Sequence, residues 1–232
     1  MTAQYACDPR KSRGRLYPEE ESEFRSCFQR DRDRIIHASA FRRLKHKSQV
    51  FVAPQGDHFT TRLTHVVEVA QVGRTIARAL NLNEDLVEAA ALAHDLGHTP
   101  FGHIGEAVLN EMLDGGFHHS RHSVRIVETL EKEGRGLNLT GEVIEAIRHH
   151  SKPEGQFLSQ VAVSHMTLEA QVVRVSDALA YLAHDISDAL RSGFFVPGDL
   201  PPEAVERLGE RHSQRVNSLV TDVVAASWDC TG

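Results

Sequence analysis

The chain has 232 residues, of which 41% are apolar and 25% charged, a balance typical of globular proteins that excludes a disordered or collagen-like chain. Its net charge is −6, and it contains 15 histidines, nearly as many as its 16 glycines. The three cysteines lie far apart and form no CxxC pair, which argues against a disulfide framework or a thiolate zinc site.

Two kinds of targeting segment are not predicted. No apolar run approaches the roughly 20 residues that a membrane-spanning helix needs. The N-terminal sequence MTAQYACDPRKSRGR lacks the apolar region of a signal peptide. We therefore expect a cytoplasmic protein with no membrane partner.

Apolar residues recur at helical spacing along most of the sequence. Pro18, followed by three glutamates, predicts a helix start, because proline is favoured early in a helix and acids stabilise its first turn. Asn83 is expected to cap a helix with the sequence EDLVEAAALAHDLG, which starts at Glu84 and is ended by Gly97. The other predicted helices span Arg30–Lys47, Arg62–Leu80, Gly102–Leu113, His119–Leu130, Gly141–His150, Thr167–Arg191 and Glu203–Ser227.

No segment alternates as a strand would, and no repeat is evident, so the predicted fold class is all-α. Loops are predicted at 52–60, 114–117, 131–139, 152–166 and 193–202. We expect one compact domain in which residues 1–60 form a basic N-terminal arm and first helices, 61–192 a core, and 193–232 a C-terminal helical extension.

The charge is distributed unevenly. Residues 1–64 hold 13 of the 26 basic residues but 8 of the 32 acidic ones, a balance of +5 against −11 for the remainder. The basic residues concentrate in Arg25–Lys47. This segment could bind an anion such as phosphate or nucleic acid. Alternatively, it is a solvated helix face whose arginines pair with Asp31 and Asp33.

The segment HDLGHTPFGHIGE (94–106) combines three histidines with two acids. Imidazole and carboxylate together hold divalent ions such as Zn²⁺, Fe²⁺, Mn²⁺ or Ni²⁺ and tolerate Mg²⁺. Neighbouring residues point about 100° apart on a helix, so His94 and Asp95 would need partners from other helices. His65 and Asp177 are the candidates.

The helix that carries Asp177 has a polar stripe, which faces either solvent or a metal and a polar ligand. The stripe consists of Asp177, Tyr181, His184, Asp185 and Asp188. From the residues alone, His184 is expected to be a buried, hydrogen-bonded histidine. His149 and His150 are expected to be imidazolium groups that stabilise a helix C-terminus.

Four segments in order extend these observations: FQRDRDRIIHASAFRRLKHKSQVF (28–51), TRLTHVVEVAQVGRTIA (61–77), HDLGHTPFGHIGE (94–106) and SDALAYLAHDISDAL (176–190). Together they resemble the dGTPase-like branch of the HD-domain phosphohydrolases, over about residues 12–227. The resemblance implies an all-helical HD fold, one divalent metal ion, and hydrolysis of a deoxynucleoside triphosphate (dNTP) to deoxynucleoside and triphosphate. Compared with that family, the chain is short at its C-terminal end.

The resemblance also implies roles for individual residues. The metal ligands would be His65, His94, Asp95 and Asp177, with Mn²⁺ or Mg²⁺ favoured and Zn²⁺, Ni²⁺, Co²⁺ or Fe²⁺ as alternatives. The catalytic residues would be His103, oriented by Glu106, and His119, although the motif around His119 departs from the family pattern. Substrate contacts would come from Arg62 and His98 to the phosphates and from Gln49, Tyr181 and Asp185 to the sugar or base.

Other functions stay open at this stage. One is an HD-type phosphatase of nucleoside monophosphates, and another is a catalytically weakened regulator that binds nucleotides or single-stranded nucleic acid. The basic segment could hold a regulatory dNTP or single-stranded nucleic acid, and a homo-oligomer is expected.

Overall fold

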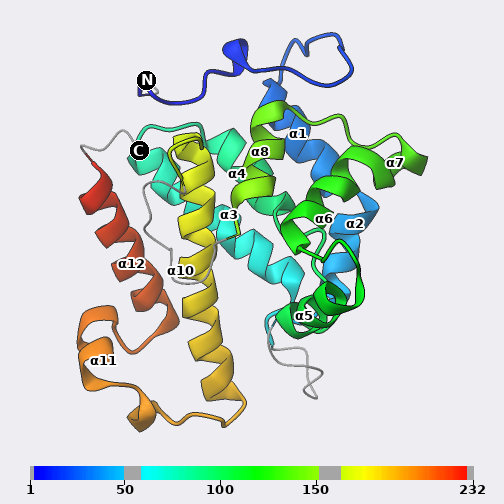
Figure 1. The fold of residues 1–232 in the computed structure, drawn as a ribbon. Helices are drawn as coiled ribbons and strands as arrows, with labels where there is room; N and C mark the ends of the chain where they lie inside the picture. Colours follow the sequence, from blue (N-terminus) through cyan, green and yellow to red (C-terminus); the bar gives the residue numbers. More distant parts are fainter. Residues whose placement is uncertain (1–2, 50–58, 152–162, 229–232) are drawn as a thin grey trace.

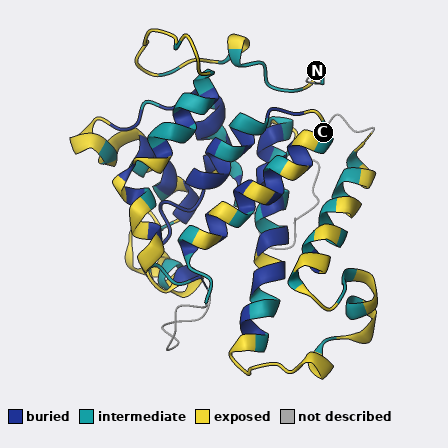
Figure 2. Ribbon diagram, turned by 180° about the vertical axis from the view of Figure 1, so that it is seen from behind, coloured by how far each residue is buried: buried dark blue, intermediate teal, exposed yellow. Residues whose placement is uncertain are grey.

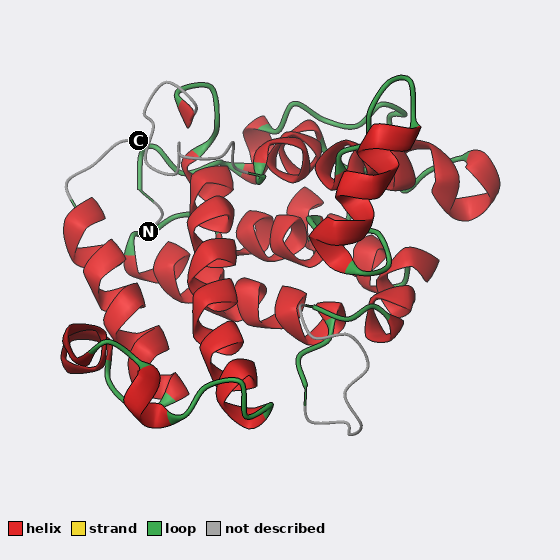
Figure 3. Ribbon diagram, turned by 60° about the horizontal axis from the view of Figure 1, so that its bottom comes forward, coloured by secondary structure: helices red, strands yellow, loops and turns green. Residues whose placement is uncertain are grey.

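The computed structural model describes residues 3–49, 59–151 and 163–228, which form helices joined by loops (Figures 1 and 3). These ranges contain no strand, only the isolated bridges Arg15–Thr140 and Ser48–Thr61, so the all-α prediction is confirmed. None of their helices is both long and apolar enough for a bilayer. The α-helices are α1 (Cys27–Ile36), α2 (Ser39–Arg43), α3 (Arg62–Ala79), α4 (Glu84–Ala93), α5 (Gly102–Met112), α6 (His119–Arg125), α7 (Glu131–Gly134), α8 (Gly141–His149), α10 (Leu168–Arg191), α11 (Pro202–Leu208) and α12 (His212–Ser227).

Helix α4 is the centre of the fold. Seven of its ten residues are buried, four of them alanines, and it contacts α1, α3, α8 and α10. A helix that buries so much of its surface is stable only when other elements surround it, and its partly exposed residues are the acids Glu84, Asp85 and Glu88. Its start is fixed as predicted, because the Asn83 side chain accepts a hydrogen bond from the Leu86 N–H at 3.1 Å.

Helices α3 and α10 pack against α4 and against each other (Figure 1). A side chain added at Gly73 of α3 would place its Cβ 2.7 Å from Val87 Cγ1 of α4 and 3.2 Å from Ser176 Oγ of α10. The absence of a side chain therefore allows three helices to approach closely at this level. Thr61 and Thr167 cap α3 and α10, each by accepting a backbone hydrogen bond.

The C-terminal helices lie on the outside. Helix α12 packs along α10 and contacts α3, and α11 lies at its start (Figure 1). Figure 2 shows that both helices are mainly exposed or half-buried, and Arg215 is the buried residue of α12. The predicted helix Glu203–Ser227 is therefore wrong in its continuity, because Gly209, with φ of 90°, separates α11 from α12.

Two predictions for the N-terminal region are also wrong. Residues 18–21 are not helical; Glu19 instead forms ion pairs with Arg30 and Arg34. The predicted helix Arg30–Lys47 is divided into α1, α2 and a 3₁₀ turn, Leu44–His46. The division is explained by Glu131, whose carboxylate accepts hydrogen bonds from the first N–H groups of α2.

Other differences are small. The predicted helix His119–Leu130 becomes α6 followed by a π-helical turn, Ile126–Leu130, and the predicted loop 131–139 begins with the irregular turn α7. Helix α4 ends at Ala93, four residues before Gly97. The predicted loops 52–60 and 152–166 lie mostly outside the described residues. The division of the chain at residues 60 and 192 stays a prediction.

Most arginines of the basic segment have acidic partners. Arg25 and Arg32 pair with Asp33, and the buried Asp31 pairs with Arg15. The expected pairing of the segment's arginines with Asp31 and Asp33 is therefore confirmed for Asp33 and wrong for Asp31, which is buried and pairs with an arginine outside the segment. Nucleic-acid binding by this segment stays a prediction.

The absence of a side chain at Gly97 allows α6 to pack closely against the loop that follows α4. A Cβ at Gly97 would lie 2.2 Å from the Ser123 backbone nitrogen and 2.6 Å from the His122 carbonyl carbon. We expect Gly97→Ala to lower the unfolding free energy by about 1–3 kcal/mol and the melting temperature by roughly 2–4 °C per kcal/mol. Thermal unfolding in the presence of a chelator measures the change in melting temperature. Gly115→Ala is the control, since a Cβ there would have no atom within 4 Å. Equal melting temperatures for the two variants would contradict the prediction that Gly97 is needed for close packing against α6.

Candidate functional site

Four side chains from three helices converge where the end of α4 meets α3 and α10. His65 lies in the first turn of α3, His94 and Asp95 follow the last residue of α4, and Asp177 lies on α10. Asp177 Oδ1 is 3.2 Å from His65 Nε2 and 3.7 Å from His94 Nε2, and His94 Nε2 is 3.6 Å from Asp95 Oδ1. The structure therefore brings together all four residues predicted to be metal ligands.

The donor atoms of this cluster fit a divalent metal ion. His94 Nδ1 donates to the Ala91 carbonyl at 2.7 Å, so Nε2 carries a lone pair whenever the ring is neutral. Burial opposes a charge on this ring, but Asp95 and Asp177 raise the pKa of His94, so a metal ion would replace a proton at Nε2. His94 Nε2 is buried and has no hydrogen-bond partner. A buried polar atom without a partner is costly, and a cation at this point would satisfy it. The side chain of Asp177 is 23% exposed, so the cluster is open to solvent on that side.

Asp95 is a buried carboxylate whose charge is compensated. Arg62, itself 2% exposed, donates to Asp95 Oδ2. Burial alone would raise the pKa of Asp95, but the charges of His94 and Arg62 hold it well below its usual range. Asp95 is therefore ionised at neutral pH and can act as a ligand.

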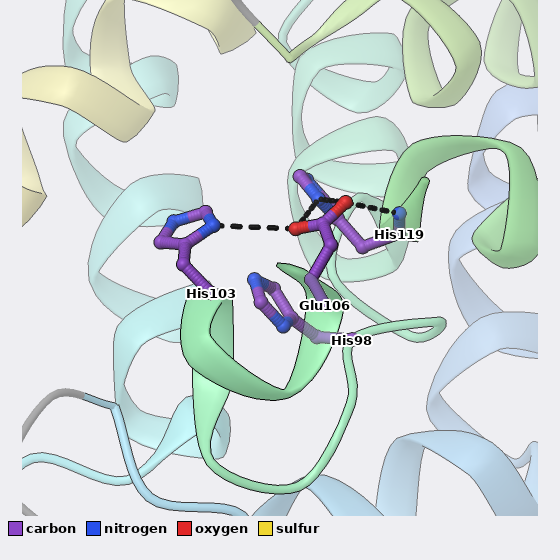
Figure 4. Close-up of side chains that lie close together, drawn as sticks. All are labelled: His98, His103, Glu106 and His119. Atoms are coloured by element: carbon purple, nitrogen blue, oxygen red, sulfur yellow. Dashed lines mark hydrogen bonds and ion pairs between the residues drawn. The ribbon is translucent and has the colours of Figure 1, made fainter. Parts of the chain in front are cut away.

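A second cluster adjoins the first (Figure 4). Figure 4 shows Glu106 of α5 between His103 and His119, with His98 beside them. Glu106 accepts from His103 Nδ1 at 3.2 Å and from the backbone N–H and Nδ1 of His119 at 2.8 and 2.9 Å. The His98 ring stacks on His119 with centroids 4.5 Å apart. All three predicted catalytic residues therefore lie in direct contact.

Two histidines of this cluster have opposite pKa shifts. Burial lowers the pKa of His98 to about 2, whereas the hydrogen bond to Glu106 raises the pKa of His103. His98 Nδ1 accepts from the Thr99 N–H at 3.1 Å, so the neutral ring carries its proton on Nε2. That N–H is buried and has no partner, and is thus available to a ligand.

The predicted sugar or base contacts come from two segments, the one that ends at Gln49 and helix α10, which carries Tyr181 and Asp185. Gln49 is 7% exposed, and its backbone carbonyl oxygen and the Arg62 guanidinium both lie next to Gly102. Tyr181 is 41% exposed, and its ring centroid lies 5.8 Å from that of His184. Desolvation and the neighbouring Asp185 raise the pKa of the Tyr181 hydroxyl.

His184 connects this region to the metal cluster. It is 2% exposed, and its Nε2 lies 3.0 Å from His65 Nδ1, which confirms that it is a buried, hydrogen-bonded residue. Its Nδ1 lies 2.9 Å from Asp185 Oδ1 without the geometry of a hydrogen bond. Burial lowers the pKa of His65 and favours its neutral form, the form that binds metals.

His150 is the residue of the site that the sequence interpretation missed. It is 1% exposed, and its Nε2 is 3.0 Å from His119 Nε2 and 3.9 Å from Asp95 Oδ1. Burial, followed by the nearby charges of His94 and His119, lowers its pKa to about 3. The prediction of an imidazolium that stabilises a helix end is therefore wrong for His150.

Two further residues hold the loop that carries His94 and Asp95. Ser123 donates to the His94 carbonyl at 2.7 Å and accepts from the Gly97 N–H at 2.8 Å. The ammonium group of Lys47 donates to the Leu96 and His98 carbonyls at 3.2 and 2.7 Å. Neither residue has a motif that would reveal it, since each acts on backbone atoms distant in sequence.

The contact between His184 and His65 predicts an effect on metal binding. Residues that hydrogen-bond a ligand histidine commonly contribute 10–100-fold to metal affinity. We expect His184→Leu to weaken Mn²⁺ binding by about that factor and His184→Gln to weaken it less, because an amide oxygen can accept from His65. Isothermal titration calorimetry measures both, with melting of the metal-free variants as the folding control. Equal affinities for Leu and Gln would indicate that the ring only fills space.

Comparisons with known proteins agree with this geometry. Residues 62–182, just over half of the chain, match the family described as HD domain. A deoxyguanosinetriphosphate triphosphohydrolase-like protein of Caldanaerobacter subterraneus subsp. tengcongensis is 56% identical over 227 residues, which are 97% of this chain and 63% of that protein.

Two more relatives carry the same description. The protein of Desulfatibacillum aliphaticivorans is 54% identical over 229 residues, 98% of this chain and 65% of that protein. The protein of a Ruegeria species is 56% identical over 216 residues, 86% of this chain and 57% of that protein. The chain thus spans less than two thirds of the length of these curated relatives.

Proposed function

We propose that this chain, which belongs to the HD domain family, is a metal-dependent hydrolase that cleaves a dNTP to deoxynucleoside and triphosphate. The observation that carries the proposal is the contact between two clusters, one suited to a metal ion and one suited to proton transfer. His98 and His119 line this junction, with His119 Nε2 3.9 Å from Asp95 Oδ1. The names of the similar proteins, which refer to deoxyguanosine triphosphate and a triphosphohydrolase, support the choice of substrate and reaction.

In this proposal His65, His94, Asp95 and Asp177 hold one divalent ion, with Mn²⁺ or Mg²⁺ favoured. When bound, such an ion acts as a Lewis acid on a phosphate oxygen and lowers the pKa of bound water. The protein contributes the ionised Asp95, kept charged by Arg62, and the neutral ring of His65.

The proton in the reaction is assigned to His103. Cleavage at the α-phosphorus expels a 5′-alkoxide, a leaving group that needs a proton, and general acid catalysis contributes about 10²–10⁴-fold. The His103 side chain is 69% exposed and can reach a substrate, while Glu106 orients its ring and favours its protonated form. Glu106 also fixes His119, so one carboxylate positions both rings.

The remaining predicted residues would bind the substrate. Arg62 supplies a positive charge near the phosphates, and His98 supplies a neutral N–H donor. Tyr181 would pack on the deoxyribose, Asp185 would accept from its 3′-hydroxyl, and Gln49 would line the sugar or base pocket.

The identity of the products tests the proposal. We expect the full chain with Mn²⁺ to release triphosphate from at least one dNTP, measured by ion-exchange chromatography of the products. His103→Gln should lower kcat by about 10²–10⁴-fold and leave the bound Mn²⁺ unchanged. His118→Gln, an exposed neighbour of His119, is the control and should retain activity.

Other results would replace the proposal. Release of monophosphate alone, with nucleoside monophosphates as better substrates, would identify a phosphomonoesterase. Bound metal without turnover of any nucleotide would identify a binding protein or regulator.

The pH dependence of turnover tests the role of Glu106. Because Glu106 raises the pKa of His103, the protonated acid persists to higher pH than in a free histidine, and activity falls as pH rises through that pKa. We expect Glu106→Gln to lower that pKa and move the alkaline limb of the kcat profile to lower pH. If kcat falls but the alkaline limb of its pH profile does not move, a group other than His103 donates the proton to the leaving group.

A further inference from the structure

A row of three side chains leads from the metal cluster to the exposed part of α10. His65 Nδ1 is 3.0 Å from His184 Nε2, and the two rings meet edge to face with centroids 5.1 Å apart. His184 Nδ1 in turn is 2.9 Å from Asp185 Oδ1. Both rings are almost fully buried, whereas the Asp185 side chain is 23% exposed. The row thus connects a buried candidate metal ligand with a carboxylate that solvent can reach.

Metal binding by His65 would fix the position of every proton in this row. The Nε2 atom of His65 faces the metal cluster, since it lies 3.2 Å from Asp177 Oδ1 and 4.0 Å from Asp95 Oδ2. A metal ion on Nε2 leaves the proton of the neutral ring on Nδ1, which then donates to His184 Nε2. Because His184 Nε2 accepts, the proton of that ring is on Nδ1, the atom that faces Asp185.

The last contact of the row is incomplete. His184 Nδ1 and Asp185 Oδ1 are buried atoms, and among the described residues neither has a hydrogen-bond partner, although they are only 2.9 Å apart. Two polar atoms left unpaired in this way are costly. Rotation of the Asp185 side chain would convert the close contact into a charge-assisted hydrogen bond. The orientation of the Asp185 carboxylate therefore decides whether the row is continuous.

Asp185 also borders the exposed part of the site. It lies one turn after Tyr181 on α10, and desolvation followed by the charge of Asp185 raises the pKa of the Tyr181 hydroxyl. Tyr181 is 41% exposed, and its ring meets the edge of the His184 ring. A carboxylate has two acceptor oxygens, so a ligand hydroxyl can donate to one of them and leave the other to His184. Such a ligand would hold the carboxylate in the orientation that completes the row.

We propose that His184 is a positioning residue that couples the metal ion to the sugar of the nucleotide. A 3′-hydroxyl bound by Asp185 orients the carboxylate toward His184, and His184 then strengthens the bond from His65 to the metal. The physical reason is that a hydrogen-bonded carboxylate makes a ligand histidine more basic, and here the effect passes through one further ring. The inference rests on the proposed function for the position of the sugar.

Thermodynamic linkage makes this coupling reciprocal. If the 3′-hydroxyl strengthens metal binding by some factor, the bound metal strengthens binding of that hydroxyl by the same factor. A sugar that lacks the hydroxyl gains nothing from the metal through this row. His184 would therefore add to the preference for nucleotides that carry a free 3′-hydroxyl, although it contacts neither the metal nor the sugar.

The affinity of the full chain for Mn²⁺ tests the coupling directly. It is measured from the electron paramagnetic resonance signal of free Mn²⁺, with and without saturating 2′-deoxyadenosine, 2′-deoxyguanosine, 2′-deoxycytidine or thymidine. These probes carry no phosphate that could bind the metal. We expect at least one of them to tighten Mn²⁺ binding by about 5-fold or more. The 2′,3′-dideoxynucleoside with the same base should leave the affinity unchanged.

Variants of the row show whether His184 carries the effect. His184→Leu should abolish the gain in Mn²⁺ affinity that the deoxynucleoside gives. His184→Gln should retain part of it, because an amide can accept from His65 and donate to Asp185. Leu182→Ala is the matched control on the same helix, since the Leu182 side chain is exposed and lies outside the row. Its gain should equal that of the wild-type chain, and melting of each metal-free variant shows whether it is folded.

Three results would overturn the inference: no gain with any of the four deoxynucleosides, an equal gain with the dideoxynucleoside, or a full gain in His184→Leu. Coupling without release of triphosphate from any dNTP would keep the inference and overturn the proposed reaction. Triphosphate release without coupling would do the opposite.

Discussion

The burial of one carboxylate, Asp95, is the constraint on which the structure of the site depends. A charged group removed from water is costly unless opposite charges and hydrogen bonds compensate it. Here Arg62 from α3 engages one oxygen, and the rings of His94, His119 and His150 lie 3.6–3.9 Å from the other. These residues come from different helices, so compensating the charge requires α3, α6 and α8 to meet at the end of α4. A divalent cation bound beside Asp95 would complete the same compensation.

Small residues make that meeting possible. Helix α4 is rich in buried alanines, and Gly73 lets α3 contact both α4 and α10 without an intervening side chain. Gly97 likewise lets α6 contact the loop after α4 closely. Ser123 of α6 forms hydrogen bonds to backbone atoms of His94 and Gly97, on both sides of Asp95. Close packing thus places the ligands, and backbone hydrogen bonds keep the loop that carries them in position. Two of the buried polar atoms without a hydrogen-bond partner, His94 Nε2 and His98 Nε2, lie in the two adjoining clusters, where a ligand could satisfy them.

The parts of the site that could be predicted from the sequence are those on regular helices. His65, His94 and Asp177 lie on or directly after helices whose apolar spacing was clear, and those helices deviate little from their predicted bounds. His150 could not be predicted, because its position at a helix end suggested solvent, whereas packing of α8 against α4 and α6 buries it. The division of Arg30–Lys47 depends on Glu131, about 90 residues away, and no local pattern contains that interaction.

The opposite pKa shifts of His98 and His103 support different roles for two rings whose centroids are only 4.9 Å apart. Two imidazolium groups at that distance would repel each other by roughly 3 kcal/mol at an effective dielectric constant of 20. Burial keeps His98 neutral and removes this repulsion, so the hydrogen bond to Glu106 can raise the pKa of His103 against the opposing effect of burial. A neutral donor for a phosphate and a charged donor for a leaving group can therefore occupy adjacent positions. The difference in burial between the two rings, which share the same chemistry, is thus what would suit them to the two proposed roles.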